Sequence, residues 1–185
     1  MIRQPLIKYV PLALVAAAAL ASNAQAATQT VAFNVLNATA TLPTPFAVGD
    51  NLVLNTLVTQ ATGALSQTIT FSVASGVTSL VGDAVWQIST AGGTGPRLIG
   101  VNIDIFDSAN TVVASDTFLG VLGGFAVSSF ASVITPGTYR LVATGNGIRD
   151  SVLDVSLSFV PEPGTYLLML AGLGVVGFMA RRRAS

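Results

Sequence analysis

The 185-residue sequence contains neither cysteine nor histidine. Without cysteine there is no disulfide framework, no thiolate metal site and no thiol nucleophile. Without histidine there is no Ser-His-Asp triad and no histidine general base. A domain that lacks disulfides must be held together by its apolar core, and 51% of this chain is apolar. The sequence therefore favours a packed structural domain over the commonest kinds of hydrolase.

Basic residues are scarce in the middle of the chain. Lysine occurs once, at Lys8, which excludes a Ser-Lys dyad from everything that follows. Between Ala27 and Val160 there are three arginines and seven aspartates, so this segment carries 3 − 7 = −4. A mildly acidic domain without lysine has no electrostatic footprint for nucleic acid. Nucleic-acid binding is therefore excluded.

The N-terminal segment 1–26 has the three regions of a secretory signal peptide. Arg3 and Lys8 make the start positive, and an apolar run of twelve residues follows from Val10 to Ala21. The small residues Ala24 and Ala26 occupy the positions that a signal peptidase recognises, so cleavage is predicted after Ala26. The apolar run is too short for a stable span, which argues against the alternative of a retained N-terminal anchor.

Two prolines open the C-terminal segment 160–185. Pro161 and Pro163 flank Glu162, and this triplet can neither continue a strand nor enter a helix interior. We therefore expect an extended, accessible segment directly after Val160.

An apolar stretch and an arginine cluster complete the C-terminus. The fifteen residues of 166–180 are apolar and predict a transmembrane helix about 22 Å long, short for a hydrocarbon core of roughly 30 Å. Arg181, Arg182 and Arg183 resist translocation and hold the tail on the cytoplasmic side. The stretch has no polar face, which argues against the alternative of a core helix in a soluble domain.

These parts in this order resemble the PEP-CTERM sorting tail of Gram-negative-type bacteria. The likeness covers the end of the chain and consists of Pro161-Glu162-Pro163, the Gly-rich apolar segment and the terminal arginines. It implies processing by an exosortase, a membrane protease-transpeptidase, after transient anchoring in the inner membrane. It also implies a cell-surface or matrix setting linked to exopolysaccharide and biofilm.

Strict alternation of apolar and polar residues dominates the segment 27–159, which we expect to form the mature domain. Such period-2 patterns predict strands with one face on a core. The clearest predicted strands are 69–73, 101–105, 139–143 and 153–159, and further candidates are Thr30–Leu36, Asn51–Thr59, Ala84–Ser89, Thr111–Ala114 and Phe125–Ser129.

Turn signals separate these strands. Pro136-Gly137 fits the central positions of a type II turn, and Gly145-Asn146-Gly147 marks a second turn. The predicted fold class is all-β, an antiparallel β-sandwich of jelly-roll or immunoglobulin-like type. Its predicted flanks are the signal helix of residues 1–26 and the transmembrane helix within the sorting tail, residues 160–185.

A pair of carboxylates is the one arrangement of catalytic residues that this composition still allows. Asp104 with Asp107, or Asp150 with Asp154, would have to converge. Aspartates on surface strands and turns more commonly serve solubility and turn formation. We therefore expect no enzyme activity and no catalytic residue, with an Asp-dependent hydrolase as the remote alternative.

Two features of the sequence could bind a ligand. Asn102, Asp104, Asp107 and Asn110 form an oxygen-rich stretch that could bind calcium, although no recognised loop motif is present. Trp86 could stack on a sugar, but its alternation with Val85 predicts a core-facing side chain. No cofactor is expected.

We expect a non-catalytic envelope or extracellular-matrix protein that an exosortase sorts through its tail. The alternative is a carbohydrate-binding or calcium-stabilised adhesion module. The expected route is export, transient anchoring in the inner membrane, and release to the cell surface or matrix.

Overall fold

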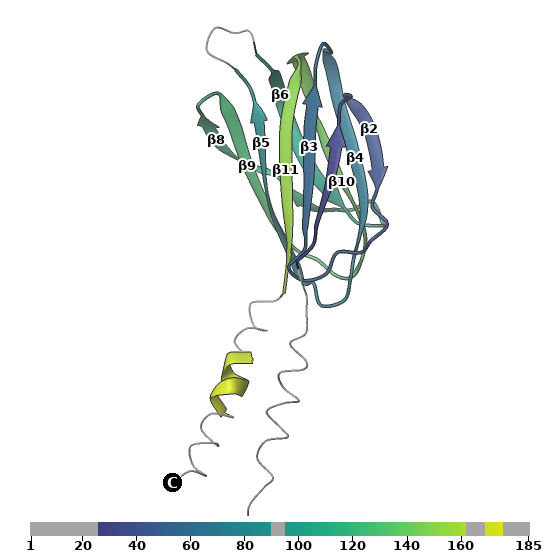
Figure 1. The fold of residues 1–185 in the computed structure, drawn as a ribbon, viewed down its shortest axis with the longest axis vertical. Coiled ribbons are helices and arrows are strands. Elements are labelled where there is room, and N and C mark those ends of the chain that lie inside the picture. Colours follow the sequence, from purple (N-terminus) through teal and green to yellow (C-terminus); the bar gives the residue numbers. More distant parts are fainter. Residues whose placement is uncertain (1–25, 90–94, 162–168, 176–185) are drawn as a thin grey trace, which may run out of the picture.

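The computed structural model describes residues 26–89, 95–161 and 169–175. In these ranges the chain forms eleven strands in two sheets (Figure 1). The strands are β1 (Thr28–Phe33), β2 (Asn37–Thr41), β3 (Asn51–Val58), β4 (Gly63–Val73), β5 (Ser79–Gln87), β6 (Arg97–Phe106), β7 (Val112–Ser115), β8 (Thr117–Leu122), β9 (Phe125–Val133), β10 (Gly137–Arg149) and β11 (Ser151–Val160).

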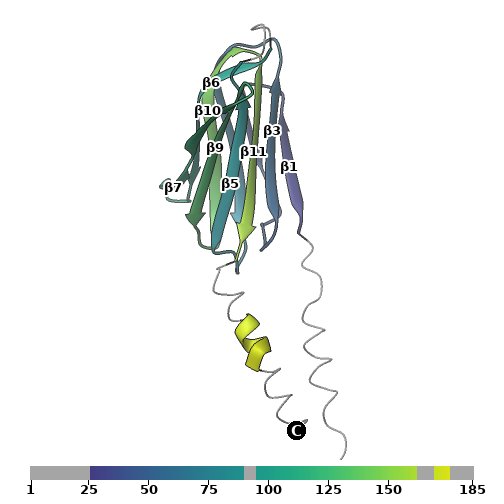
Figure 2. The ribbon, with the colours of Figure 1, turned by 90° about the vertical axis from the view of Figure 1, so that its left-hand side faces the viewer.

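The two sheets face each other across one core. The larger sheet has the order β1-β3-β11-β5-β9-β8, and its strands run side by side in Figure 2. The smaller sheet has the order β2-β4-β10-β6-β7. From β3 onward the pairing is nested, because β11 lies between β3 and β5 while β10 lies between β4 and β6. This nested order is that of a jelly roll, one of the two sandwich types predicted.

Alternation produces the core. Every second residue of β11, from Ser151 to Phe159, is buried, and the residues between them face outward. Phe46, Phe71 and Phe159 meet near one end of the sandwich, with the rings of Phe46 and Phe159 stacked at 4.5 Å. Since Phe71 belongs to the smaller sheet and Phe159 to the larger one, this aromatic cluster joins the two layers.

The prediction of a wholly antiparallel sandwich is wrong at its N-terminal edge. β1 pairs in parallel with β3, from Thr28 opposite Asn51 to Phe33 opposite Thr56. β2 pairs in parallel with β4. The remaining strand pairs are antiparallel. Alternation reports which face of a strand is buried and carries no information on the direction of its neighbour.

Two strands were not predicted, and both lie at sheet edges. Every residue of β2 and of β8 is exposed or half-buried, so neither strand has a fully buried face. Without such a face the sequence lacks the periodic signal that identified the other nine. The predicted strand bounds also shift by several residues, for example from Ala84–Ser89 to the observed β5.

Two predicted turns are wrong. Gly137 is the first residue of β10, opposite Val73, and lacks the positive φ that a type II turn requires. Gly145-Asn146-Gly147 continues β10, and its glycines coincide with two irregularities in the pairing of β10 with β6. Glycine in a strand interior commonly marks such a bulge.

The two predicted flanking helices fall largely beyond the described ranges. Residues 169–175 are helical and lie inside the predicted segment 166–180 (Figure 1). Among the residues that the structure describes, no helix combines the length and the apolar character needed to cross a membrane. The signal helix and the remainder of 166–180 stay predictions.

Candidate functional site

Both ends of the sandwich chain leave it at the same pole. Figures 1 and 2 show β1 starting and β11 ending at the lower end of the two sheets. The loop 47–50 lies between these ends: Gly49 N–H donates to Phe159 O at 2.7 Å, and Phe159 N–H donates to Asp50 O at 3.0 Å. On the other side Asn51 N–H donates to Ala27 O at 2.8 Å. One short loop therefore fastens the first and last residues of the domain.

Asp50 makes hydrogen bonds to both ends of the domain through its side chain and its backbone. The residue is 8% exposed, and its carboxylate accepts from two backbone N–H groups, Oδ1 from Ala27 N at 2.7 Å and Oδ2 from Ala47 N at 2.8 Å. Gly49 has φ 90°, a left-handed conformation that glycine adopts without strain, and it turns the loop toward β3. No pattern in the sequence indicated that this aspartate bonds to a residue near the start of the domain.

The strand ladder stops where the proline triplet begins. Val160 is the last residue of β11, and its carbonyl accepts from Thr78 N at 3.2 Å. Pro161 has no N–H to donate, so the ladder cannot continue through it. The ladder of β11 therefore ends at the pole, and the extended segment predicted after it lies largely outside the described residues.

The other residues predicted for processing are only partly described. Ala26 is exposed and directly precedes Ala27. Ala24, Glu162, Pro163 and the terminal arginines, Arg181 to Arg183, lie outside the described residues.

Comparison with protein families gives one match in this part of the chain. The model for the PEP-CTERM protein-sorting motif matches residues 159–183. The chain carries a PEP-CTERM sorting motif. The match begins at Phe159, the residue that the 47–50 loop brackets. This motif implies an exported protein that passes the membrane and is processed by an exosortase-type enzyme.

Two solved structures resemble this chain distantly. The pre-peptidase C-terminal domain of a collagenase from Bacillus anthracis is 14% identical, with a TM-score of 0.36, over 74% of this chain and 99% of that one. PliG of Aeromonas hydrophila, a periplasmic inhibitor of g-type lysozyme, is 12% identical, with a TM-score of 0.35, over 66% of this chain and 97% of that one. Among curated proteins no sequence matches.

The oxygen-rich stretch considered for calcium is engaged in separate local bonds. Asp104 accepts from Ser115 Oγ at 2.5 Å and from Asn102 Nδ2 at 2.6 Å. Asn110 Oδ1 accepts from the guanidinium of Arg140. The oxygens of Asp104 and Asn110 thus accept hydrogen bonds from neighbouring side chains of the same sheet.

Asp107 closes the turn between β6 and β7. Its Oδ1 accepts from the backbone N–H groups of Ala109 and Thr111, at 2.9 and 2.8 Å. Such an Asx arrangement is an ordinary reason for aspartate in a turn. Over the described ranges, no three acidic side chains lie together as metal ligands would. The stretch therefore consists of the end of β6 and the turn that leads from it into the edge strand β7.

The second carboxylate pair, Asp150 and Asp154, does not converge in the structure. Asp150 is the single residue between β10 and β11, which lie in different sheets, and its Oδ1 accepts from Gln60 N at 2.5 Å. Asp154 lies four residues further on, roughly 13 Å away at about 3.3 Å per residue. Burial raises the pKa of the Asp154 carboxyl above its ordinary value. The two carboxylates therefore do not share a reaction centre.

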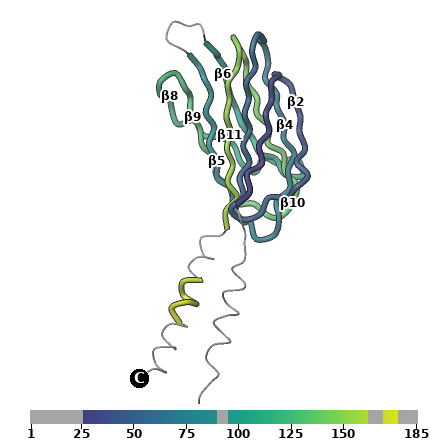
Figure 3. Tube along the Cα trace, in the orientation of Figure 1, coloured from purple at the N-terminus to yellow at the C-terminus, as the bar shows by residue number. Residues whose placement is uncertain are grey.

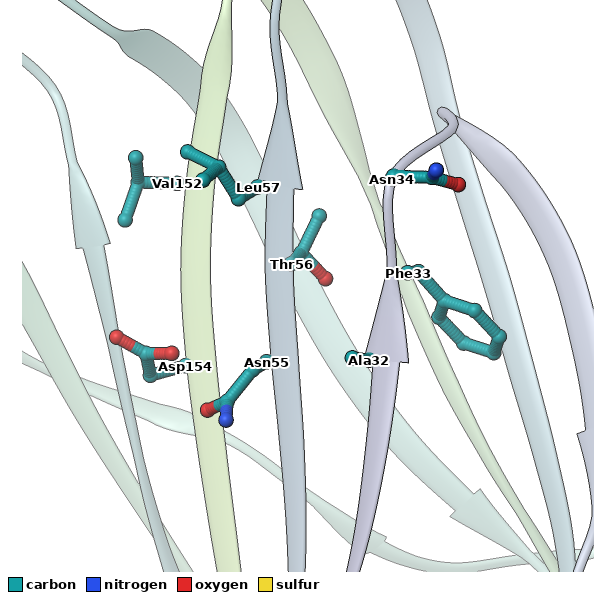
Figure 4. Close-up of a pocket in the computed structure, with 8 residues that line it drawn as sticks. All are labelled: Ala32, Phe33, Asn34, Asn55, Thr56, Leu57, Val152 and Asp154. Atoms are coloured by element: carbon teal, nitrogen blue, oxygen red, sulfur yellow. The ribbon is translucent and has the colours of Figure 1, made fainter.

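Asp154 lines a shallow depression on the outer face of the larger sheet (Figure 4). Asn55 on β3 is its direct cross-strand neighbour, and Ala32 on β1 is the next residue across. Leu57 and Val152, paired on the same two strands, border the depression with apolar side chains. The sequence indicated Asp154 but not this neighbourhood, because β3 and β11 lie at opposite ends of the domain's sequence.

Trp86 faces the interior, as its alternation predicted. It is buried between the sheets, and its ring lies 6.2 Å from that of Phe118 on β8. This placement removes Trp86 as a surface platform for sugars.

The β8 edge is the apolar surface of the sandwich. Phe118, Leu119, Val121 and Leu122 are all exposed, and β8 contains no charged residue. Gly123 and Gly124, with φ 59° and 88°, turn the chain from β8 into β9, and the two strands lie next to each other in Figure 3. An exposed apolar edge strand is a template for pairing with other strands.

Proposed function

We propose that this PEP-CTERM protein is a non-catalytic component of the cell envelope or extracellular matrix, delivered by an exosortase and associated with exopolysaccharide. The observation that supports it most directly is the sorting motif, which begins at Phe159 inside the last strand and leaves the sandwich at one pole. The aspartates considered for catalysis are bonded locally or stand apart, which gives no support to a hydrolase.

The geometry suits removal of the tail after folding. β11 is complete at Val160, and its pairing with β3 and β5 uses only residues up to that point. Proteolysis beyond Pro161 therefore removes none of the hydrogen bonds that join β11 to β3 and β5. We infer that the exosortase acts on a folded domain whose exit strand it does not need to unpair.

Fractionation in the native host tests this proposal. A tagged wild-type protein should appear at the surface or in the matrix, with its C-terminal segment removed as judged by mass spectrometry. A variant with Pro161, Glu162 and Pro163 replaced by alanine should stay in the inner membrane unprocessed. Recovery of intact wild-type protein in the cytoplasm would sink the proposal.

The second candidate function is carbohydrate binding, and the depression beside Asp154 is the observation that favours it. A carboxylate and an amide, Asp154 and Asn55, are neighbours there, next to the apolar side chains of Leu57 and Val152. Polar groups that fix hydroxyls beside apolar surface are common in ligand sites. The host's exopolysaccharide should then bind the wild-type protein and bind Asp154→Ala more weakly, while cooperative thermal unfolding of both shows that the variant is folded. Equal binding by both would remove this candidate.

A further inference from the structure

The bond between Ala27 and Asp50 lies at the predicted cleavage point of the signal peptide. Cleavage after Ala26 would make Ala27 the first residue of the mature chain. Ala27 N is already 2.7 Å from Asp50 Oδ1, and Ala27 O accepts from Asn51 N at 2.8 Å. Ala27 is thus hydrogen-bonded through both its N–H and its carbonyl. Cleavage would therefore produce the new α-amino group at a position that already faces the Asp50 carboxylate.

Cleavage changes the chemistry of this bond. Water hydrolyses the peptide bond between Ala26 and Ala27, leaving a carboxylate on Ala26 and an α-amino group on Ala27 that takes up a proton. A neutral amide donor is thereby replaced by an ammonium, which carries a positive charge and two further N–H donors. The bond is already assisted by the charge of the carboxylate, and a cationic donor adds direct attraction between two opposite charges at the same short distance.

We propose that signal-peptide removal creates an ammonium–carboxylate pair between Ala27 and the buried Asp50, which locks the pole of the mature domain. This inference rests on the export step of the proposed function. Asp50 is suited to the role because Oδ2 is held by Ala47 N, so Oδ1 keeps its direction toward Ala27. Its burial also limits the screening that weakens exposed ion pairs.

The loop that carries Asp50 is also hydrogen-bonded to the last strand of the domain. The backbone carbonyl of Asp50 accepts from Phe159 N, and Gly49 N–H donates to Phe159 O. Phe159 begins the match to the sorting motif. Processing at the N-terminus therefore tightens the loop that holds the exit strand of the C-terminal tail.

The experiment compares two versions of the mature chain in detergent, each released from a cleavable fusion partner. One begins at Ala27 and the other at Ala26, so they differ by one alanine and by the position of the ammonium. The chain beginning at Ala27 should melt about 2 to 4 °C higher. With Asp50→Asn in both chains this difference should vanish. An equal or lower melting temperature for the wild-type Ala27 chain overturns the proposal.

A second measurement needs no substitution. Both chains lack lysine, so the α-amino group is their only primary amine and an acetylating reagent modifies it selectively. Acetylation should abolish the added stability of the Ala27 chain and leave the Ala26 chain unchanged. A melting temperature of the Ala27 chain that does not respond to acetylation overturns the proposal even if Asp50→Asn fails to fold.

N-terminal sequencing of the exported protein separates this inference from the proposed function. Ala27 as the first residue supports both. Export with another first residue overturns the lock and leaves sorting intact, whereas absence of export overturns the proposed function itself.

Discussion

The hydroxyl of Thr56 donates a 2.6 Å hydrogen bond to Gln67 Oε1 in the buried interior of the sandwich. Thr56 belongs to β3 of the larger sheet and Gln67 to β4 of the smaller one. Gln67 Nε2 also donates to Val35 O at 3.0 Å, in the segment between β1 and β2. This polar bridge joins the two layers and the connection that crosses between them.

Replacing Thr56 with valine should destabilise the protein by about 1–3 kcal/mol, because Gln67 Oε1 would be left buried without a donor. Thr56→Ser keeps the hydroxyl and is the matched control. Denaturant unfolding of both variants measures the difference. A valine variant as stable as the serine variant would show that the bridge contributes nothing.

Gly82→Ala should cost about 1–3 kcal/mol through overpacking. A Cβ on Gly82 would lie 2.4 Å from the Phe130 ring and 2.6 Å from Ser156 O, and the carbonyl cannot move without disturbing β11. Gly137→Ala is the control, since the nearest atom to its added Cβ is 4.0 Å away. Thermal unfolding should separate the two variants clearly, and similar melting temperatures would contradict the predicted clash.

Asp154→Asn should stabilise the protein slightly at neutral pH, within about 0.5 kcal/mol. Burial raises the pKa of this carboxyl in the folded state, so the folded state binds its proton more tightly than the unfolded chain does. The contribution of Asp154 to stability is therefore present below the ordinary aspartate pKa and is lost as the pH rises through the raised value. Melting curves between pH 3 and 8 should show the variant's advantage growing with pH and disappearing at the acid end. An advantage that is constant over this range would contradict the assignment.

Leu122→Lys should reduce self-association of the protein without lowering its stability. Leu122 is 80% exposed on an uncharged edge strand, and lysine on such an edge opposes pairing with other strands. Light scattering against concentration measures association, and Leu119→Lys on the same strand offers an independent repeat. The control is Thr28→Lys, which adds the same charge on the opposite edge strand β1. If the control reduces association as much as Leu122→Lys does, net charge rather than the β8 edge is responsible.

Alternation in the sequence predicted the strands that have one buried face. The alternation of Leu153, Val155, Leu157 and Phe159 is reproduced in β11, and Trp86 points inward as its neighbours required. The strand β8 was missed because its large apolar residues face solvent at an edge, and its Gly120 interrupts the run. The parallel pairing of β1 was missed because side-chain patterns do not encode the direction of a neighbouring strand.

The sequence predicted the sorting motif of the candidate site but not the contacts of Asp50. The proline triplet and the sorting motif are local patterns, and they could be found without a structure. The role of Asp50 depends on Ala27 at the start of the domain and on Phe159 at its end, and neither is a sequence neighbour. Only the folding of β1, β3 and β11 into one sheet brings these three residues together.

The position of β11 determines how the domain withstands a pull on its C-terminal tail. This strand lies in the middle of the larger sheet, with Ser151–Ser158 paired to β3 and Leu153–Val160 paired to β5. Force applied along the strand from Pro161 loads both ladders in shear, so their hydrogen bonds must break together rather than one after another. The domain is thus mechanically resistant to a pull that acts on it along this strand.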